Sequence, residues 1–368
     1  MYENAASGDA SSAAAPPAVP SFDQRVLESA IGALELFGIY LGDRLGLYAA
    51  LRDGRPTTVA ELAARCGIHP RYAREWLEQQ AVAGVLEVDD AGADAEKRRY
   101  RLPEAHAAVV ASPEHPAYLA PLARMLAGIG RVLEEVAAAY RTGGGVPYAR
   151  YGADFRHGQG GINRPAFSTS LVDAWIPAVP GLAARLAAGG RVADLGCGQG
   201  WAAVSVARAF PAAEVWGLDC DAASIEDARA AAAEASVRVR FECADAAALA
   251  AHGPFDLVLL LEVLHDLARP VEALAAARRA AAGDGTVLVA DELVAPRFEA
   301  PGDPLERMMY GWSIVHCLPT QMAESPSAAL GTVLREGTVR ELAARAGFRE
   351  TRVLDADGGF FRLYALRP

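Results

Sequence analysis

The sequence predicts an α/β protein, in which a mainly helical N-terminal part precedes a doubly wound, largely parallel sheet that ends in an antiparallel hairpin. From residue 191 onward, short apolar strands alternate with alanine-rich helical segments, as in parallel sheets. Near the C-terminus, residues 355–359 place aspartates and glycines between two apolar segments, which indicates a hairpin turn. Before residue 191, apolar residues recur at helical spacing instead.

The composition is that of an ordinary globular protein, and 368 residues suffice for two domains. A net charge of −11 argues against general affinity for nucleic acid or anionic membranes. The five cysteines show no paired spacing, which fits free thiols in a reducing cytoplasm, and the sequence shows no metal site. The longest strongly apolar run, 257–261, is too short to span a bilayer. Residues 1–21 are rich in Ala, Ser and Pro, lack the pattern of a signal peptide, and are expected to be a disordered tail.

Residues 22–111 have the pattern of a helical domain with a two-stranded wing. Apolar residues at helical spacing cover 26–40 and 41–51. Thr58 and Glu61 form a capping-box signature for a short helix, and Pro70 opens a longer helix that Gly84 closes. The segments 85–88 and 98–102 can pair as strands across an acidic loop. Together these features predict a winged-helix domain.

A winged helix suggests DNA binding, and its charge tests that hypothesis. The segment 57–86 carries equal numbers of arginines and glutamates, whereas a DNA reader needs a basic face. Basic residues gather only in the wing, at Lys97, Arg98, Arg99 and Arg101, and such a short run is usually a solvated face. A structural role is therefore favoured over DNA binding.

The segment 192–200, V-A-D-L-G-C-G-Q-G, predicts a strand, a tight turn and the start of a helix that can hold a nucleotide-type ligand. A dinucleotide site needs the spacing G-x-G-x-x-G, but after Gly196 and Gly198 the third glycine, Gly200, comes one residue early. Asp194 at the strand end would repel a pyrophosphate and attract a cationic ligand. Asp219 ends the next strand, 19 residues after Gly200, where an acid can bind ribose hydroxyls.

The pattern D-x-G-x-G-x-G, followed by G-x-D after the second strand, resembles the class I S-adenosylmethionine-dependent methyltransferases. The resemblance implies a Rossmann-like, seven-stranded methyltransferase sheet over residues 181–368, and its C-terminal hairpin separates it from the dinucleotide-binding folds. It also implies S-adenosylmethionine as cofactor and S-adenosylhomocysteine as product. In similar small-molecule methyltransferases the winged-helix domain forms the dimer and covers the substrate, so we expect a homodimer, with residues 112–180 as a helical linker and cap.

Three further segments supply the remaining cofactor residues that the resemblance implies. Ala244 and Asp245 follow the third strand, where an acid accepts the adenine amino group, although Asp245 can equally cap the next helix. Glu262 ends the fourth strand at the cleft. The segment 162–170 resembles the F-N-x-x-M-x-x-x-S motif of plant-type O-methyltransferases, with Ser170 in place for the methionine carboxylate or, equally, as a surface hydroxyl. Its Asn163 is also in place, while Ile162 and Ala166 replace the Phe and Met.

His265 lies in an L-H-D segment that resembles the base-bearing segment of small-molecule O-methyltransferases. A neutral imidazole there can accept the proton of a hydroxyl that attacks the sulfonium methyl group, or the histidine can be structural. Asp291 and Glu336 occupy positions that resemble the acids orienting this base, although they can also be a strand cap and a surface residue. Glu336 precedes a second capping-box signature, 338–341. The apolar segment 308–319 predicts a helix that lines the acceptor pocket or the core, with Met308, Met309, Tyr310 and Trp312.

The sequence therefore predicts methyl transfer from S-adenosylmethionine to a small molecule, most simply to a hydroxyl group. N- or C-methylation and a non-methylating reaction with the same cofactor stay open. A hypothesis of another class is a transcriptional regulator that senses the cofactor through its winged helix, and salt-sensitive DNA binding would distinguish it. Nothing in the sequence identifies the acceptor.

Overall fold

The computed structural model describes residues 21–368. Most of the tail expected to be disordered, residues 1–20, lies outside the described residues. Ser21 belongs to the fold, because it is the N-cap residue of the first helix, α1 (Phe22–Arg44).

The N-terminal domain consists of helices beside a small antiparallel sheet. After α1 its elements are α2 (Leu47–Leu51), α3 (Val59–Cys66), α4 (Pro70–Val82), β1 (Glu87–Val88), β2 (Tyr100–Arg101) and α5 (Glu104–Val110). The predicted capping box is present at α3, since the Thr58 hydroxyl accepts from the Glu61 N–H and the Glu61 carboxylate accepts from the Thr58 N–H. β1 and β2 pair antiparallel as the predicted wing.

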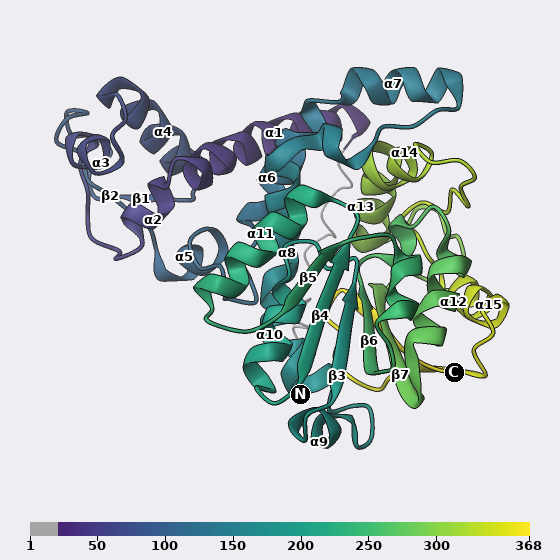
Figure 1. Cartoon of the computed structure of the whole chain (residues 1–368). Coiled ribbons are helices and arrows are strands. Elements are labelled where there is room, and N and C mark those ends of the chain that lie inside the picture. Colours follow the sequence, from purple (N-terminus) through teal and green to yellow (C-terminus); the bar gives the residue numbers. More distant parts are fainter. Residues whose placement is uncertain (1–20) are drawn as a thin grey trace, which may run out of the picture.

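A run of helices connects this domain to the sheet. It comprises α6 (Ala120–Gly130), α7 (Leu133–Thr142), the 3₁₀ helix η1 (Tyr148–Tyr151), α8 (Gly152–Ser168), the π-helix η2 (Leu171–Trp175) and α9 (Leu182–Ala187). Figure 1 shows α1 extending from the winged-helix elements toward α7, and α1 packs against α6, which packs against α8. No helix among residues 21–368 is both long and apolar enough to cross a membrane.

The second domain is built on a seven-stranded sheet in the order β5-β4-β3-β6-β7-β9-β8. β9 runs antiparallel to both β7 and β8, and the other neighbours are parallel, so the predicted C-terminal hairpin is confirmed. The strands are β3 (Arg191–Leu195), β4 (Glu214–Asp219), β5 (Arg240–Cys243), β6 (Phe255–Leu261), β7 (Ala281–Glu292), β8 (Glu350–Val353) and β9 (Phe361–Arg367).

Helices cover both faces of this sheet, as in other doubly wound folds (Figure 1). One apolar core lies between the sheet and three helical elements, η2, α9 and α10 (Trp201–Ala209). On the same domain, α11 (Ala222–Glu234) packs against β4 and β5. The other core lies between the sheet and η3 (Ala246–Ala251), α12 (Pro270–Ala280) and α15 (Glu336–Arg345). The remaining helical elements, near the carboxyl ends of the strands, are η4 (Leu264–Asp266), α13 (Pro304–Trp312), the π-helix η5 (Ser313–Cys317) and α14 (Leu318–Gln321).

One local prediction differs from the structure. The capping box predicted at 338–341 is wrong, since α15 already begins at Glu336 with Arg335 as its N-cap. Thr338 therefore lies inside the first turn of that helix.

Candidate cofactor and active site

The glycine-rich loop turns tightly at the carboxyl end of β3. Gly196 has φ +72°, and a Cβ added there would lie 2.3 Å from Cγ2 of Val263. Gly200 has φ +76° and caps the N-terminus of α10. Only glycine takes up such backbone at little cost, so the spacing of these residues fixes a narrow loop that leads directly into the helix.

Asp219, at the end of β4, ties this loop to the neighbouring strands. One of its carboxylate oxygens accepts from the Gly198 N–H at 2.8 Å, and the other accepts from the Asp221 N–H at 2.8 Å. Its carbonyl accepts from the Ala244 N–H at 3.0 Å. Gly198, Asp219 and Ala244 thus meet at the edge where ligands bind in open α/β sheets.

Asp194 is the most unusual acid of this edge, since its side chain is buried inside the protein. The residue is 2% exposed, and Oδ2 has no hydrogen-bond partner. Burial raises the pKa of Asp194 to about 7, because an isolated charge in a dry environment is costly. A cationic group beside this carboxylate would remove that cost.

Asp245 lies differently, on the surface next to the same edge. It caps η3, because Oδ1 accepts from the Ala247 N–H at 2.8 Å, as one of its two sequence interpretations predicts. Its second oxygen accepts from Arg269 at 3.4 Å. One carboxylate oxygen is therefore engaged with the backbone, while the side chain stays accessible to a ligand.

A cavity of about 350 Å³ opens beyond the ends of β6 and β7. Its walls are largely apolar and include Leu122, Met125, Met308, Met309, Trp312 and Phe361. All four motif residues of the segment 162–170 line it as well: Ile162, Asn163, Ala166 and Ser170. Tyr310 does not line the cavity and is 39% exposed, so this member of the predicted pocket helix points elsewhere.

The polar end of the cavity consists of Glu262, His265 and Glu292. Glu262 has φ +59°, a conformation that costs a non-glycine residue roughly 1–2 kcal/mol, and Oε1 is buried without a partner. Such local strain is typical of functional positions. Burial raises the pKa of Glu262 to about 7.

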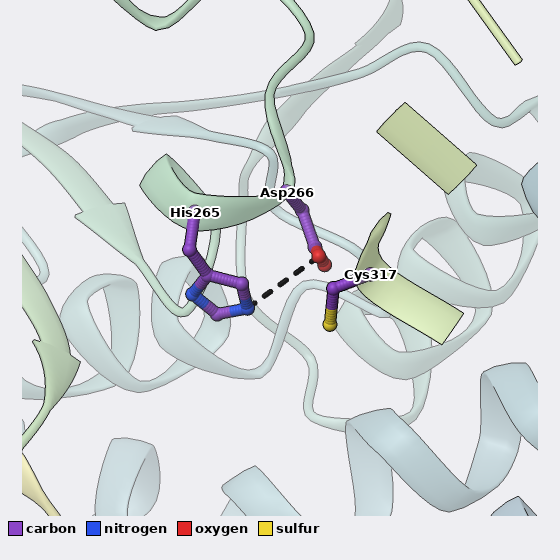
Figure 2. A group of neighbouring side chains, drawn as sticks. All are labelled: His265, Asp266 and Cys317. Atoms are coloured by element: carbon purple, nitrogen blue, oxygen red, sulfur yellow. Dashed lines mark ion pairs between the residues drawn. The ribbon is translucent and has the colours of Figure 1, made fainter. Parts of the chain in front are cut away.

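His265 is buried among acids. Its Nδ1 lies 3.1 Å from Oδ1 of Asp291 and 3.3 Å from Oε2 of Glu292. Its Nε2 lies 3.4 Å from Oδ1 of Asp266, and Figure 2 shows the ring and this carboxylate facing each other, with the Cys317 side chain beside them. One imidazole is thus held by carboxylates on both of its nitrogens.

The electrostatics of this cluster favour a protonated imidazole. Although burial favours the neutral ring, the negative charges of Glu292, Asp291 and Asp266 raise the pKa of His265 well above its ordinary value. Burial would also raise the pKa of Asp291, but the positive ring of His265 lowers it. For Glu292, burial and the nearby Glu262 raise the pKa well above the usual range.

Comparison with family models identifies both domains. Residues 192–285 match the model of a methyltransferase domain, and residues 32–112 match that of an Rv2258c-like winged HTH domain. The chain carries a methyltransferase domain. The resemblance seen in the glycine and aspartate pattern is thereby confirmed. No curated protein matches the chain significantly.

Solved structures with the same overall fold cover both domains. The mitomycin 7-O-methyltransferase MmcR is 22% identical, with a TM-score of 0.66 over 94% of this chain and 97% of its own. Human N-acetylserotonin methyltransferase in complex with SAM is 19% identical, with a TM-score of 0.67 over 95% and 98%. PigF with SAH is 18% identical, with a TM-score of 0.67 over 95% and 100%. The chain is similar to these enzymes in fold.

One of the acids expected to orient the base of the methyltransferase domain lies elsewhere. Glu336 binds Arg340 at 2.9 Å and lies 3.9 Å from Arg362, and it is not among the acids in contact with His265. The first turn of α15 directs it toward these arginines. The second carboxylate on Nδ1 is Glu292, which directly follows Asp291 on β7.

The sequence reasoning also did not select Asp266, Cys317 or Gln321. Gln321 is buried, donates to the His265 carbonyl and accepts from the Gly331 N–H at 3.1 Å, so it fixes the backbone of the histidine. The D of L-H-D could have indicated Asp266. Nothing local to residues 317 and 321 shows that α13, η5 and α14 return them to the end of β6.

Proposed function

We propose that this chain transfers the methyl group of S-adenosylmethionine to a hydroxyl group of a small, largely apolar acceptor. The observation that carries the proposal is the junction of two sites at the end of β6. The glycine loop with Asp194 and Asp219 lies on one side, and the apolar cavity that ends at His265 lies on the other. Glu262, directly after β6, lines the cavity, and the next residue, Val263, lies against Gly196 of the loop.

The positive charges of S-adenosylmethionine complement the buried carboxylate oxygens that have no hydrogen-bond partner at this edge of the sheet. Asp194 Oδ2 and Glu262 Oε1 are buried acceptors without donors, and an amino group and a sulfonium would supply positive charge beside them. Asp219 and Asp245 offer acceptors for ribose hydroxyls and an adenine amino group. Three neighbours in fold, PigF, human N-acetylserotonin methyltransferase and CalO1, hold SAH, SAM and SAH respectively.

When bound, the cofactor supplies an activated methyl group, and the chain positions the acceptor for an in-line attack. Holding two reactants in a dry cleft can contribute about 7–11 kcal/mol to lowering the barrier. Nε2 of His265 takes the hydroxyl proton once the ring is neutral, and Asp291 and Glu292 stabilise the imidazolium that forms. Because these acids also favour the resting imidazolium, the base becomes available only as the pH rises.

The test is a methyl-transfer assay with isotopically labelled cofactor and a panel of phenols, aliphatic alcohols, amines and carbon nucleophiles. We expect labelled product from the wild type and about 10²- to 10⁴-fold slower turnover from His265→Ala, with unchanged cofactor affinity. In Asp219→Ala, the cofactor affinity itself should fall. Full turnover by His265→Ala would refute the base role. Cofactor binding without methylated product would favour the non-methylating alternative, and labelled amines or carbon acceptors would favour N- or C-methylation.

The chain's assembly as a homodimer and its cytoplasmic location are parts of the same proposal. α1 exposes a stripe of apolar side chains at helical spacing, which consists of Phe22, Val26, Leu27, Ile31, Leu34, Phe37 and Leu41. Contiguous apolar surface of this kind is usually covered by a partner, and a second copy of this helix is the simplest one. The free cysteines support a reducing compartment.

The regulator hypothesis is disfavoured by the surface of α4. Its arginines are neutralised within the helix, since Arg71 pairs with Glu75 and Arg74 pairs with Glu78. A DNA reader needs uncompensated positive charge on this helix. Salt-sensitive binding to a DNA duplex would support the regulator hypothesis in place of a structural winged helix.

A further inference from the structure

We propose that His265, Asp266 and Cys317 form a binding site for a divalent cation of the zinc type. We further propose that the bound ion occupies the ring nitrogen that the methyl transfer needs as a base. The first part stands on the geometry alone, and the second rests on the proposed function.

The three ligand atoms lie close enough together for one ion to bind all of them. Nε2 of His265, one carboxylate oxygen of Asp266 and Sγ of Cys317 all lie within 4.8 Å of one another. The distance from Nε2 to Oδ1 of Asp266 is 3.4 Å. Around zinc, bonds of about 2.0–2.1 Å separate nitrogen and oxygen ligands by about 3.4 Å, and the thiolate bond is slightly longer. Figure 2 shows the three side chains converging from two segments of the chain.

The histidine is prepared for an ion at Nε2. Its Nδ1 lies 3.1 Å from the fully buried Asp291 and 3.3 Å from Glu292, so that nitrogen carries the proton and donates it to a carboxylate. The ion therefore displaces the second ring proton, the one on Nε2, and binds the lone pair that this proton leaves. A carboxylate that accepts from the second nitrogen of a ligating histidine is a regular feature of zinc sites and strengthens the ligand.

Unpartnered acceptors point independently to a missing cation. Oδ1 of Asp266 is buried and has no hydrogen-bond partner. The same holds for one oxygen each of Glu262, Asp291 and Glu292, which surround the same imidazole. Four carboxyl groups face one ring, and buried acceptors without donors are costly. A divalent ion at Nε2 would contact one of them and lower the potential at the others.

The donor set selects the class of ion, and the cavity gives it access. A thiolate and an imidazole favour zinc over magnesium or calcium, which prefer oxygen ligands only. His265 and Cys317 both line the cavity, so the fourth position faces it and can hold water. An ion bound there would take the lone pair that a hydroxyl acceptor needs, and methyl transfer would stop.

The test uses Co²⁺ as a spectroscopic probe in the full chain, without any methyl donor. Cys66, Cys220 and Cys243 are first changed to serine to remove the more accessible thiols. We expect one Co²⁺ per chain, with the visible absorption of a tetrahedral ion and a thiolate-to-cobalt band, both abolished by Zn²⁺. Cys317→Ala should lose the thiolate band, whereas Cys197→Ala, which removes the other buried cysteine, should retain it.

Two further variants keep the test decisive if Cys317→Ala does not fold, as judged by its melting curve. Asp266→Asn should weaken Co²⁺ binding more than tenfold while the thiolate band remains at saturation. Asp291→Asn, which changes the partner of Nδ1, should weaken it by about 10- to 100-fold. A thiolate band that persists in folded Cys317→Ala, or affinities unaffected by both aspartate variants, would overturn the site.

The blocking role has a separate readout. Saturating Zn²⁺ should lower methyl transfer by the wild type at least tenfold, and a chelator should restore it. Undiminished activity with the ion bound would overturn the blocking role and leave the site intact. An enzyme that binds Co²⁺ as described but methylates nothing would instead refute the proposed function.

Discussion

Replacing Asp194 with asparagine should separate the stability of the fold from its affinity for the cofactor. In the ligand-free protein, burial raises the pKa of this carboxyl to about 7, whereas in the unfolded chain it ionises near the ordinary pKa of 3.8. The native state therefore holds the proton longer, and the free energy of unfolding falls as the pH rises from about 4 to 7. The difference between the two pKa values corresponds to a loss of at most about 4 kcal/mol in the free energy of unfolding. Asp194→Asn should recover part of this stability at pH 8.

The same carboxyl should make cofactor binding depend on pH in the opposite direction. A cationic ligand binds the ionised form, so wild-type affinity should rise about tenfold per pH unit between pH 5.5 and 7 and then level off. The ligand's own amino group stays protonated over this range, since α-amino groups titrate near about 7.7–8.0. Asp194→Asn should bind weakly and show a shallower slope, because only Glu262, whose pKa burial also raises to about 7, still titrates beside the ligand.

The assay is calorimetric titration with S-adenosylhomocysteine and S-adenosylmethionine from pH 5.5 to 8.5, combined with melting curves of the ligand-free proteins. Asp245→Asn is the matched control, because this exposed acid can change affinity without removing the slope. A wild-type affinity that does not vary below pH 7, or an equal slope in Asp194→Asn, would refute the reasoning. So would a ligand-free Asp194→Asn that is less stable than the wild type at pH 8.

Other predictions follow from single contacts. Gly196→Ala and Gly198→Ala both introduce the strain of a positive φ, roughly 1–2 kcal/mol, but only the Cβ of Gly196→Ala would clash, with the side chain of Val263. Chemical denaturation should therefore show the larger loss of unfolding free energy for Gly196→Ala. Asp291→Asn should lower turnover strongly and shift the rise of the pH–rate profile toward lower pH, because it removes a charge that raises the pKa of His265. Glu336→Gln, which changes an acid paired with Arg340, should leave the profile in place. Equal shifts in both variants would contradict the role of Asp291 as the partner of His265. Leu34→Glu should convert the proposed homodimer to monomer in light scattering, and a dimeric mass that the substitution leaves unchanged would exclude α1 from the interface.

The parts of the fold that depend on local pattern could be predicted from the sequence. Alternation of strands and helices, the turn at 355–359 and the capping box at Thr58 are short-range signals, and each has its counterpart in the structure. The second capping-box signature failed because the same residue types also occur inside a first turn. There Arg335, with an extended backbone, already ends the preceding loop.

The candidate site likewise has one part that short-range sequence pattern predicts and one part that depends on long-range packing. The glycine loop, Asp194 and Asp219 follow one another closely along the chain, so the cofactor edge could be inferred from spacing. The environment of His265 could not, because it is assembled from β6, β7 and η5, which are separated by tens of residues. The resemblance to O-methyltransferases implied that Glu336 lies near the base, but the packing of β7 brings Glu292 to Nδ1 of His265 instead. The same long-range packing brings Cys317 to the histidine, which explains why cysteine spacing gave no sign of a metal site.

The base role of His265 and the proposed metal site both require the same atom, Nε2. Nδ1 of His265 is committed to Asp291 and Glu292, so Nε2 is the single ring nitrogen that can accept either a proton or an ion. An acceptor hydroxyl bound at Nε2 should therefore protect the site from a metal, and a metal should exclude the hydroxyl from its reactive position. Because the ion would also bind Asp266 and Cys317, a substitution of Cys317 affects the two processes differently. It removes an ion ligand and leaves the nitrogen that serves as base, so it should relieve inhibition by zinc without the loss of turnover that His265→Ala causes.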